Sequence, residues 1–342
     1  MDVTDWLLED DAPGVAYLAR ERLLGEAAGS SKMQSLRRRG NEYPPVARML
    51  DRLDEARDVR DYQKYRGAYW TLIFLADMLA DGRDKRVRKL ADRVLSSQLP
   101  DGGFSPGGEL RYEIVCLSAN ILRALVHFGY GRDERVIRGY RRLIERILPH
   151  GGVPCVIMDY FLHSSCKMAL PQTLRSLAAA PPGVPRSPLK KARDLLVEQL
   201  LAIRIYRYVR PDAKAFHAAV AKRPKGMKVR EFKARWLTTH EVSDDELLPK
   251  PGWLRFGFPR HYNPDLLEAM LALAESGVKH TPVLDEALDH IEKKRGTDGR
   301  WKLDDSLNGK MLAEIERKGK PSKWITLRAL IVLKHFGRRA KC

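Results

Sequence analysis

The sequence lacks a disulfide framework, since it has only 4 cysteines among 342 residues. Small secreted domains that depend on disulfides use cysteine far more densely. It also lacks a signal peptide, because residues 1–6 are acidic and no basic start or apolar run follows them. The most apolar stretch, residues 70–80, is interrupted by Asp77 and is too short to span a bilayer. These absences predict a cytoplasmic protein.

Several motifs of nucleotide-binding and hydrolytic enzymes are also missing. The sequence has no phosphate-binding loop, no dinucleotide fingerprint, no nucleophile elbow and no HExxH motif. Patterns typical of β-strands are almost absent, and residues 253–258 are expected to form an irregular connection or the start of a helix. The sequence therefore predicts an all-α fold and does not identify a reaction.

Acidic residues are too few to balance the basic ones. There are 62 lysines and arginines against 44 aspartates and glutamates, which gives a formal net charge of +18. A balance this basic favours a polyanionic partner, such as nucleic acid, an acidic membrane surface or a phosphorylated ligand. The alternative is a basic but inert surface, because net charge governs solubility and encounter rather than fold.

The most informative feature present is an internal repeat of about 49 residues. GRDKRV at residues 82–87 recurs as GRDERV at 131–136, and QLPDGGF at 98–104 recurs as ILPHGGV at 147–153. A further copy, RGTDGRW at 295–301, lies close to four such steps beyond the first. The glycines in these segments predict turns, because glycine permits the positive φ that a tight reversal needs.

Each repeat unit predicts two helices of different character. The first is apolar nearly all round, as buried helices are, and the second carries one apolar stripe among basic residues. An inner layer of buried helices inside an outer layer of amphipathic ones accounts for both patterns. The expected inner helices cover residues 113–128, 163–178, 264–276 and 323–336. The expected outer stripes are Val87, Leu90, Ala91, Val94 and Leu95; Val136, Tyr140, Leu143, Ile144 and Ile147; and Leu284, Ala287, Leu288 and Ile291.

The QLPDGGF and RGTDGRW segments resemble the QxxDGxW repeat of squalene–hopene cyclases. That superfamily, which includes the protein prenyltransferase β subunits, has an α/α-toroid fold. The resemblance implies a toroid over residues 65–342, with an irregular basic insertion at about 208–252 and a helical segment, residues 1–64, that packs on the ring. Proteins with this fold have several unrelated activities, so the fold alone does not identify the function.

For function, the resemblance implies a central cavity that binds an apolar or isoprenoid-type ligand. If the protein is an enzyme, it would be a transferase or a cyclase. The DxDD motif with which class II terpene cyclases protonate their substrate is absent, and the nearest segment, LDDS at residues 303–306, lacks the first aspartate. The alternatives are a non-catalytic protein that binds nucleic acid or another polyanion, and a scaffold stabilised by a metal.

Three cysteines and one histidine form a candidate zinc site: Cys116, Cys155, His163 and Cys166. Cys116 and Cys166 are expected to open successive inner helices, and the other two lie in the connection between them. If equivalent helix ends share one rim, all four side chains converge. Cys3His is an accepted zinc ligand set, and three ligands would leave a position open for catalysis. The alternative is that these cysteines only fill the core.

Glu113 and Asn120 share one face of an expected inner helix with Cys116. If that face lines the central cavity, Glu113 is a candidate acid or base and Asn120 a candidate for orienting a ligand. A buried polar pair that bonds to neighbouring helices explains the same pattern.

A later segment supplies His261 as a further catalytic candidate. The aromatic cluster before and after it is a candidate lining for an apolar cavity, although such clusters also form plain core. The candidate ligand-binding residues are Trp253, Phe256, Arg260 and Tyr262. Asp265 and Glu268, which follow, are interpreted as first-turn acids favoured by the helix dipole.

Residues 210–235 form a second candidate contact surface, with nine basic residues against Asp212 and Glu231. Phe216, Phe232 and Trp236 lie among them or just beyond. Basic charge with aromatic rings can bind a nucleic-acid backbone and its stacked bases. The same charge could steer a diphosphate or dock on acidic lipid, and a solvated loop is the plain alternative.

Overall fold

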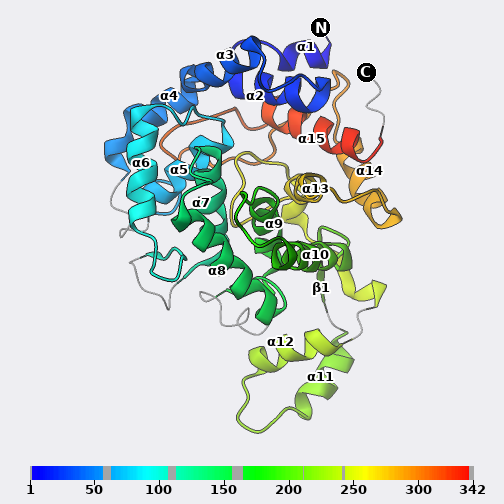
Figure 1. Cartoon of the computed structure of the whole chain (residues 1–342). Helices are drawn as coiled ribbons and strands as arrows, with labels where there is room; N and C mark the ends of the chain where they lie inside the picture. The colour runs from blue at the N-terminus through cyan, green and yellow to red at the C-terminus, as the bar shows by residue number, and fades with distance from the viewer. Residues whose placement is uncertain are drawn as a thin grey trace.

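The computed structural model describes residues 2–56, 63–106, 113–155, 165–210, 212–240 and 243–338. These residues are mostly helical, as the sequence predicts, and Figure 1 shows one large body from which a helical hairpin projects. The α-helices are α1 (Val3–Leu7), α2 (Pro13–Leu18), α3 (Ser31–Arg39), α4 (Pro44–Asp51), α5 (Ala68–Asp77), α6 (Lys85–Ser96), α7 (Val115–His127), α8 (Glu134–His150), α9 (Leu170–Ala178), α10 (Arg186–Ala202), α11 (Ala213–Ala221), α12 (Val229–Thr239), α13 (Leu266–Glu275), α14 (Asp285–Lys293) and α15 (Lys323–His335). A π-helix, η1 (Ala19–Leu24), continues α2, and the strands are β1 (Arg207–Val209) and β2 (Leu247–Pro249).

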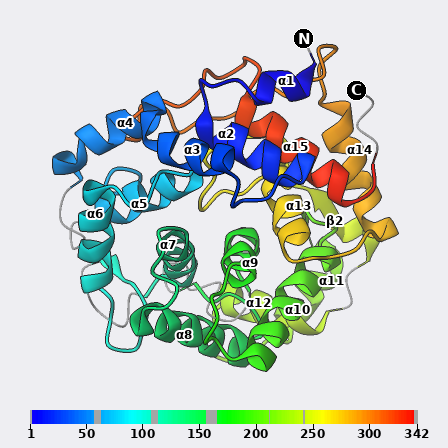
Figure 2. The ribbon, with the colours of Figure 1, turned by 45° about the horizontal axis from the view of Figure 1, so that its top comes forward.

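The helices of the body lie in two layers. In Figure 2, α7, α9 and α13 lie inside, and α6, α8, α10 and α14 lie toward the outside. Every residue of the apolar stripes predicted for α6, α8 and α14 is buried, whereas α5 is buried at each of its positions. A helix that is apolar all round needs neighbours on every side, and a striped helix needs them on one. The burial of these helices follows their apolar patterns.

The inner helices contact one another in chain order, from α5 to α7, α9, α13 and α15. The N-terminal helices join the two ends of this series, because α2 contacts α15 and α4 contacts α5. Buried residues of α1, α2 and α4 belong to the same hydrophobic core as those of the inner helices, and Ala16, Tyr17, Met33 and Leu36 form a small second cluster between α2 and α3. The N-terminal segment and the later helices therefore share their buried surface.

The glycine turns have the predicted backbone conformation. Each is also tied to the inner helix that follows: the Phe104 N–H donates to Ser118 Oγ at 2.9 Å, and the Trp301 N–H donates to Thr326 Oγ1 at 3.0 Å. These bonds fix where the chain re-enters the interior. The turn glycines with a positive φ are Gly102 (102°), Gly151 (70°) and Gly299 (78°).

Helix α9 begins later than the sequence predicts. Its first residue is Leu170, after a 3-10 turn at Lys167–Ala169, rather than residue 163. Pro171 fixes this start, because proline has no N–H to donate and is favoured only in the first helical turn. Cys166 therefore precedes the inner helix and does not open it, which corrects the prediction; residues 156–164 lie outside the described ranges.

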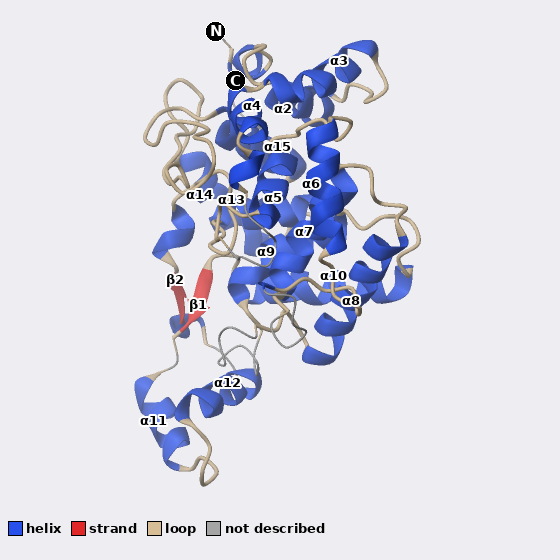
Figure 3. Ribbon diagram, turned by 90° about the vertical axis from the view of Figure 1, so that its left-hand side faces the viewer, coloured by secondary structure: helices blue, strands red, loops and turns tan. Residues whose placement is uncertain are grey.

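A small antiparallel sheet connects the body to the projecting hairpin. Strand β1 pairs with β2 so that Arg207 lies opposite Pro249 and Val209 lies opposite Leu247. Figure 3 shows this sheet between the body and helices α11 and α12. Strands of three residues are too short to give a periodic signal, so the sequence did not predict them. None of the helices within the described ranges combines the length and hydrophobicity needed to cross a membrane.

Candidate functional site

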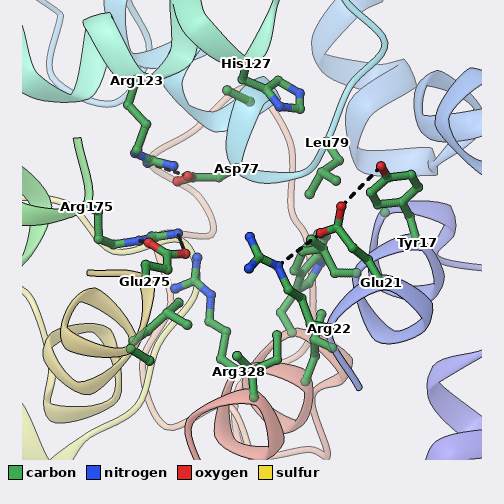
Figure 4. Close-up of a pocket in the computed structure, with 18 of the residues that line it drawn as sticks. Tyr17, Glu21, Arg22, Asp77, Leu79, Arg123, His127, Arg175, Glu275 and Arg328 are labelled. Atoms are coloured by element: carbon green, nitrogen blue, oxygen red, sulfur yellow. Dashed lines mark hydrogen bonds and ion pairs between the residues drawn. The ribbon is translucent and has the colours of Figure 1, made fainter. Parts of the chain in front are cut away.

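The inner helices surround a cavity of about 520 Å³ (Figure 4). Its wall is built by α5, α7, α9, α13 and α15, together with α2, η1 and α3 from the N-terminal segment. The volume falls within the range of pockets that bind small organic ligands. Helices near both ends of the described chain therefore shape one site.

Part of this wall is apolar. It is covered by the ring of Trp324 and by aliphatic side chains from several elements. A hydrocarbon group bound here would therefore be shielded from water. The aliphatic residues are Leu18, Leu36, Leu79, Leu271, Leu327 and Ile331.

Three arginines occupy matching positions on three inner helices: Arg123 on α7, Arg175 on α9 and Arg328 on α15. Each lies in the local sequence Leu-Arg-Ala/Ser-Leu, at residues 122–125, 174–177 and 327–330. All three line the cavity, and Figure 4 shows their guanidinium groups directed into it. Because arginine keeps its charge in any protein environment, each one brings a fixed positive charge to the interior and requires a partner.

Asp77, the last residue of α5, is the partner of Arg123. Its carboxylate accepts hydrogen bonds from Arg123 at 2.7 Å and from His261 Nε2 at 2.8 Å. Burial opposes ionisation of this carboxyl, but the charge of Arg123 and the hydrogen bond from His261 outweigh burial and hold the pKa of Asp77 well below its usual range. Asp77 is therefore ionised at neutral pH.

Glu268 on α13 is the shared partner of the other two arginines. It is buried, contacts the guanidinium groups of Arg175 and Arg328, and accepts a hydrogen bond from the Gln172 amide at 3.1 Å. Burial opposes its ionisation, but the two arginines lower the pKa of Glu268 to about 2. Arg175 also pairs with Glu275 at 2.7 Å. One charged network thus joins α9, α13 and α15.

The remaining cations of the wall are more exposed. Arg22 pairs with Glu21 at 3.1 Å, and the Lys334 ammonium donates to the carbonyl oxygens of Arg22 and Leu23. Arg37 has no carboxylate partner within the described part of the chain. In all, six cationic side chains and three carboxylates line the cavity. Glu268, behind the wall, balances one more of these cations, which leaves a surplus of two positive charges that attracts anions. The carboxylates are Glu21, Asp77 and Glu275.

His127 lies beside Arg37 on the same wall, and both residues also line an adjoining pocket of about 290 Å³. Its Nε2 bonds to the Ala80 carbonyl oxygen at 3.2 Å. A carbonyl oxygen only accepts, so Nε2 must carry the hydrogen and Nδ1 retains its lone pair. Burial lowers the pKa of His127 to about 4, and the imidazole is therefore neutral at pH 7.

His261 lies behind the cavity wall and does not line it. Its ring is buried against the rings of Trp70 and Phe74, and its bond to Asp77 helps to fix that carboxylate. The histidine predicted as a catalytic candidate thus supports the site through Asp77.

The four predicted ligand-binding residues are also absent from the cavity wall. Arg260 forms ion pairs with Asp265 and Asp305, Tyr262 packs edge-on against Trp70, and Trp253 lies beneath the Lys250 ammonium. Phe256 is buried and its backbone N–H donates to Asp304. These residues connect the segment before α13 to its neighbours and form core.

Glu113 and Asn120 do not reach the cavity either. Glu113 is buried and pairs with Arg142 at 3.0 Å and with Arg146 at 3.3 Å, both on α8. Burial raises the pKa of Glu113, and the charge of Arg142 opposes that rise. The Asn120 amide donates back to the Cys116 carbonyl at 2.9 Å. Glu113 therefore bonds to α8, and Asn120 bonds within α7.

Three of the four predicted zinc ligands lie together. The thiols of Cys155 and Cys166 share a hydrogen bond, which together with burial raises the pKa of Cys166, and burial raises the pKa of the neighbouring Cys116 to about 12. Among the residues that the structure describes, no group of three or more Cys, His, Asp or Glu is placed to hold a metal ion. His163 lies outside those residues, so the four-ligand site stays a prediction.

The sequence analysis missed the arginines and misjudged Glu268. A signal was present: each otherwise apolar inner helix carries at least one charged residue, and Leu-Arg-Ala/Ser-Leu recurs in three of them. Glu268 does lie in the first turn of α13, but it binds two arginines rather than only favouring the helix dipole.

Neither a scan against protein-family models nor a search of curated proteins found a match for this chain. The resemblance to toroid proteins therefore depends on the repeat motifs, and any inference about the function depends on the cavity.

Proposed function

We propose that the protein is an α/α toroid whose central cavity binds an amphiphilic anion, namely an isoprenoid-like hydrocarbon that carries a phosphate or diphosphate group. The observation that carries this proposal is the surplus of two positive charges on a cavity wall that is otherwise largely apolar. The toroid is supported by the two helix layers, the contacts of the inner helices in chain order and the glycine turns.

The two kinds of wall suit the two parts of such a ligand. Leucines, Ile331 and Trp324 would cover the hydrocarbon, and guanidinium groups bind phosphate oxygens with two parallel hydrogen bonds. The buried arginines and Arg22 already have carboxylate partners, so the surplus charge comes from Arg37 and Lys334. The anionic group is therefore expected near these more exposed residues.

The charge states favour ligand binding or group transfer over cyclisation started by a proton. Asp77 and Glu268 are ionised and held by arginines, so neither carboxyl has a proton to give an alkene at neutral pH. The absence of the DxDD motif from the sequence agrees with this conclusion. His127, neutral and with a free lone pair on Nδ1, is the group best suited to accept a proton or a hydrogen bond.

Calorimetric titration with farnesyl diphosphate, farnesol and inorganic diphosphate tests the proposal. Farnesyl diphosphate should bind more tightly than either fragment, because only it engages both parts of the wall. Arg37→Gln should weaken its binding by about tenfold, since a charge-assisted hydrogen bond contributes roughly 1.5–3 kcal/mol.

Arg38→Gln is the matched control, because Arg38 is exposed on the same helix and does not line the cavity. It should leave the affinity unchanged. Failure of folded wild-type protein to bind farnesyl diphosphate, or an equal loss in the two variants, would contradict the proposal.

A further inference from the structure

Helices α11 and α12 form a hairpin that stands apart from the cavity. The two helices contact each other, no residue of α11 is buried, and Figure 3 shows the pair beyond the β1–β2 sheet, away from the body. We call residues 212–240 the basic hairpin. At its base, the Glu246 carboxylate accepts hydrogen bonds from the Asp212 backbone N–H and from His240, which fixes the point of attachment.

The basic hairpin carries more positive charge than its fold requires. It contains eight basic and two acidic residues, a formal net charge of +6. Both acids are already engaged, since Asp212 caps α11 and Glu231 pairs with Arg235 at 2.8 Å. Four exposed cations surround the turn between the helices, and none of them has a carboxylate partner among the described residues: Lys222, Arg223, Lys225 and Lys228.

The aromatic rings of the hairpin face one another. Trp236 stacks on His240 with ring centres 3.9 Å apart and lies 5.4 Å from Phe216, and the Lys233 ammonium lies over the Phe216 ring. These rings hold the two helices together, so they are not available as platforms for bases. The prediction that they stack on nucleic-acid bases is therefore not supported. Only the positive charge of the hairpin is available to bind a partner.

The turn also lacks the groups that insert into a bilayer. Residues 222–228 read KRPKGMK, with no tryptophan, phenylalanine or leucine, and Met227 is only half-buried within the turn. Membrane-surface helices combine basic residues with such bulky apolar side chains. Unpaired cations without an apolar anchor instead match a soluble polymer of phosphate groups.

We propose that the basic hairpin binds the phosphodiester backbone of a nucleic acid and does not read its base sequence. The lysines and arginine of the turn replace counterions condensed on the phosphates, and the small sheet holds the hairpin clear of the body. This surface is separate from the central cavity, so loss of either activity leaves the other intact.

Fluorescence anisotropy with a labelled DNA duplex and a labelled single strand tests this inference on the full-length protein. Four phosphate contacts predict that log K falls with log salt at a slope of about −3.6, or roughly a hundredfold loss of affinity between 50 and 200 mM NaCl. Lys222→Gln combined with Lys225→Gln should reduce the magnitude of this slope by about two and weaken binding at low salt at least tenfold.

The control is Lys85→Gln combined with Lys89→Gln, which removes the same charge from the exposed face of α6. It should bind like the wild type, and Arg37→Gln should do so as well. An equal loss in the α6 variant would show that only net charge matters, and absence of binding at low salt would overturn the proposal. Binding to phosphatidylserine vesicles without binding to either DNA would assign the hairpin to membranes and also overturn it.

Discussion

Replacing Glu268 with glutamine should destabilise the protein more than any other single change in the charged network. The side chain is 1% exposed and contacts two guanidinium groups, those of Arg175 and Arg328. Glutamine keeps the shape but removes the charge, and within the described residues Arg328 has no second carboxylate. Removing one partner of a buried ion pair costs about 3–5 kcal/mol, so we expect the free energy of unfolding to fall by that amount.

Urea unfolding followed by circular dichroism measures this change. Glu275→Gln is the control, because Glu275 is more exposed and Arg175 keeps Glu268; its cost should be about 1 kcal/mol. In the double variant with Arg328→Gln, the loss should be smaller than the sum of the two single losses, because no buried charge is left without a partner.

The pH dependence gives an independent measurement of the same carboxyl. Its pKa is about 2 in the folded protein against an ordinary 4.5, so the unfolded chain binds more protons between these values. Stability from this group is complete above pH 4.5 and is lost as the pH falls toward 2; its full size is roughly 3 kcal/mol. Glu268→Gln should lack this part of the acid sensitivity. The reasoning fails if Glu268→Gln costs no more than Glu275→Gln, or if acid destabilises wild type and variant alike.

Three further predictions concern other parts of the structure. Burial lowers the pKa of His127 to about 4, so the unfolded state binds a proton at a higher pH than the folded state does. The free energy of unfolding should therefore fall as the pH drops from 6.5 to 4. His127→Gln should remove this dependence, measured by thermal melts at pH 7 and 5. Gly102→Ala should lower the free energy of unfolding by about 1–3 kcal/mol in urea titrations, because φ is 102° and an added Cβ would lie 2.9 Å from the Arg138 carbonyl oxygen. If the predicted zinc site exists, Cys116→Ser and Cys166→Ser should each lower the zinc content of the purified protein by mass spectrometry; unchanged zinc in both would exclude these ligands.

The helices and their burial were predictable because each depends on a local pattern. The stripe on α6 follows from helical periodicity, the burial of α5 follows from its nearly continuous apolar sequence, and Gly102 follows from the conformation that a turn demands. The late start of α9 was not predicted, because the start was inferred from the spacing between Cys116 and Cys166, and the polar residues in HSSCKMA at 163–169 were given no weight. Pro171 also marked the boundary.

The site was harder to predict because its residues are paired across the interior. Arg328 and Glu268 lie on different helices, and nothing in either local sequence names the other as its partner. The predicted candidates Glu113 and His261 are both buried. Glu113 pairs with Arg142 on α8 and His261 bonds to Asp77, so neither side chain faces the cavity. A charged residue inside an apolar helix was the available signal, and it identifies a residue in need of a partner without saying where that partner is.

The composition of the cavity wall has a consequence for biosynthesis. Gly14 and Tyr17 near one end of the chain and Lys334 and His335 near the other belong to the same wall. A growing chain on the ribosome can form α7 with α8 or α9 with α10 early, since those helices are close in sequence, but the chamber stays incomplete until α15 has left the exit tunnel. Nascent or truncated chains that lack α15 should therefore hold no ligand, so loading of the cavity requires that helix to be in place.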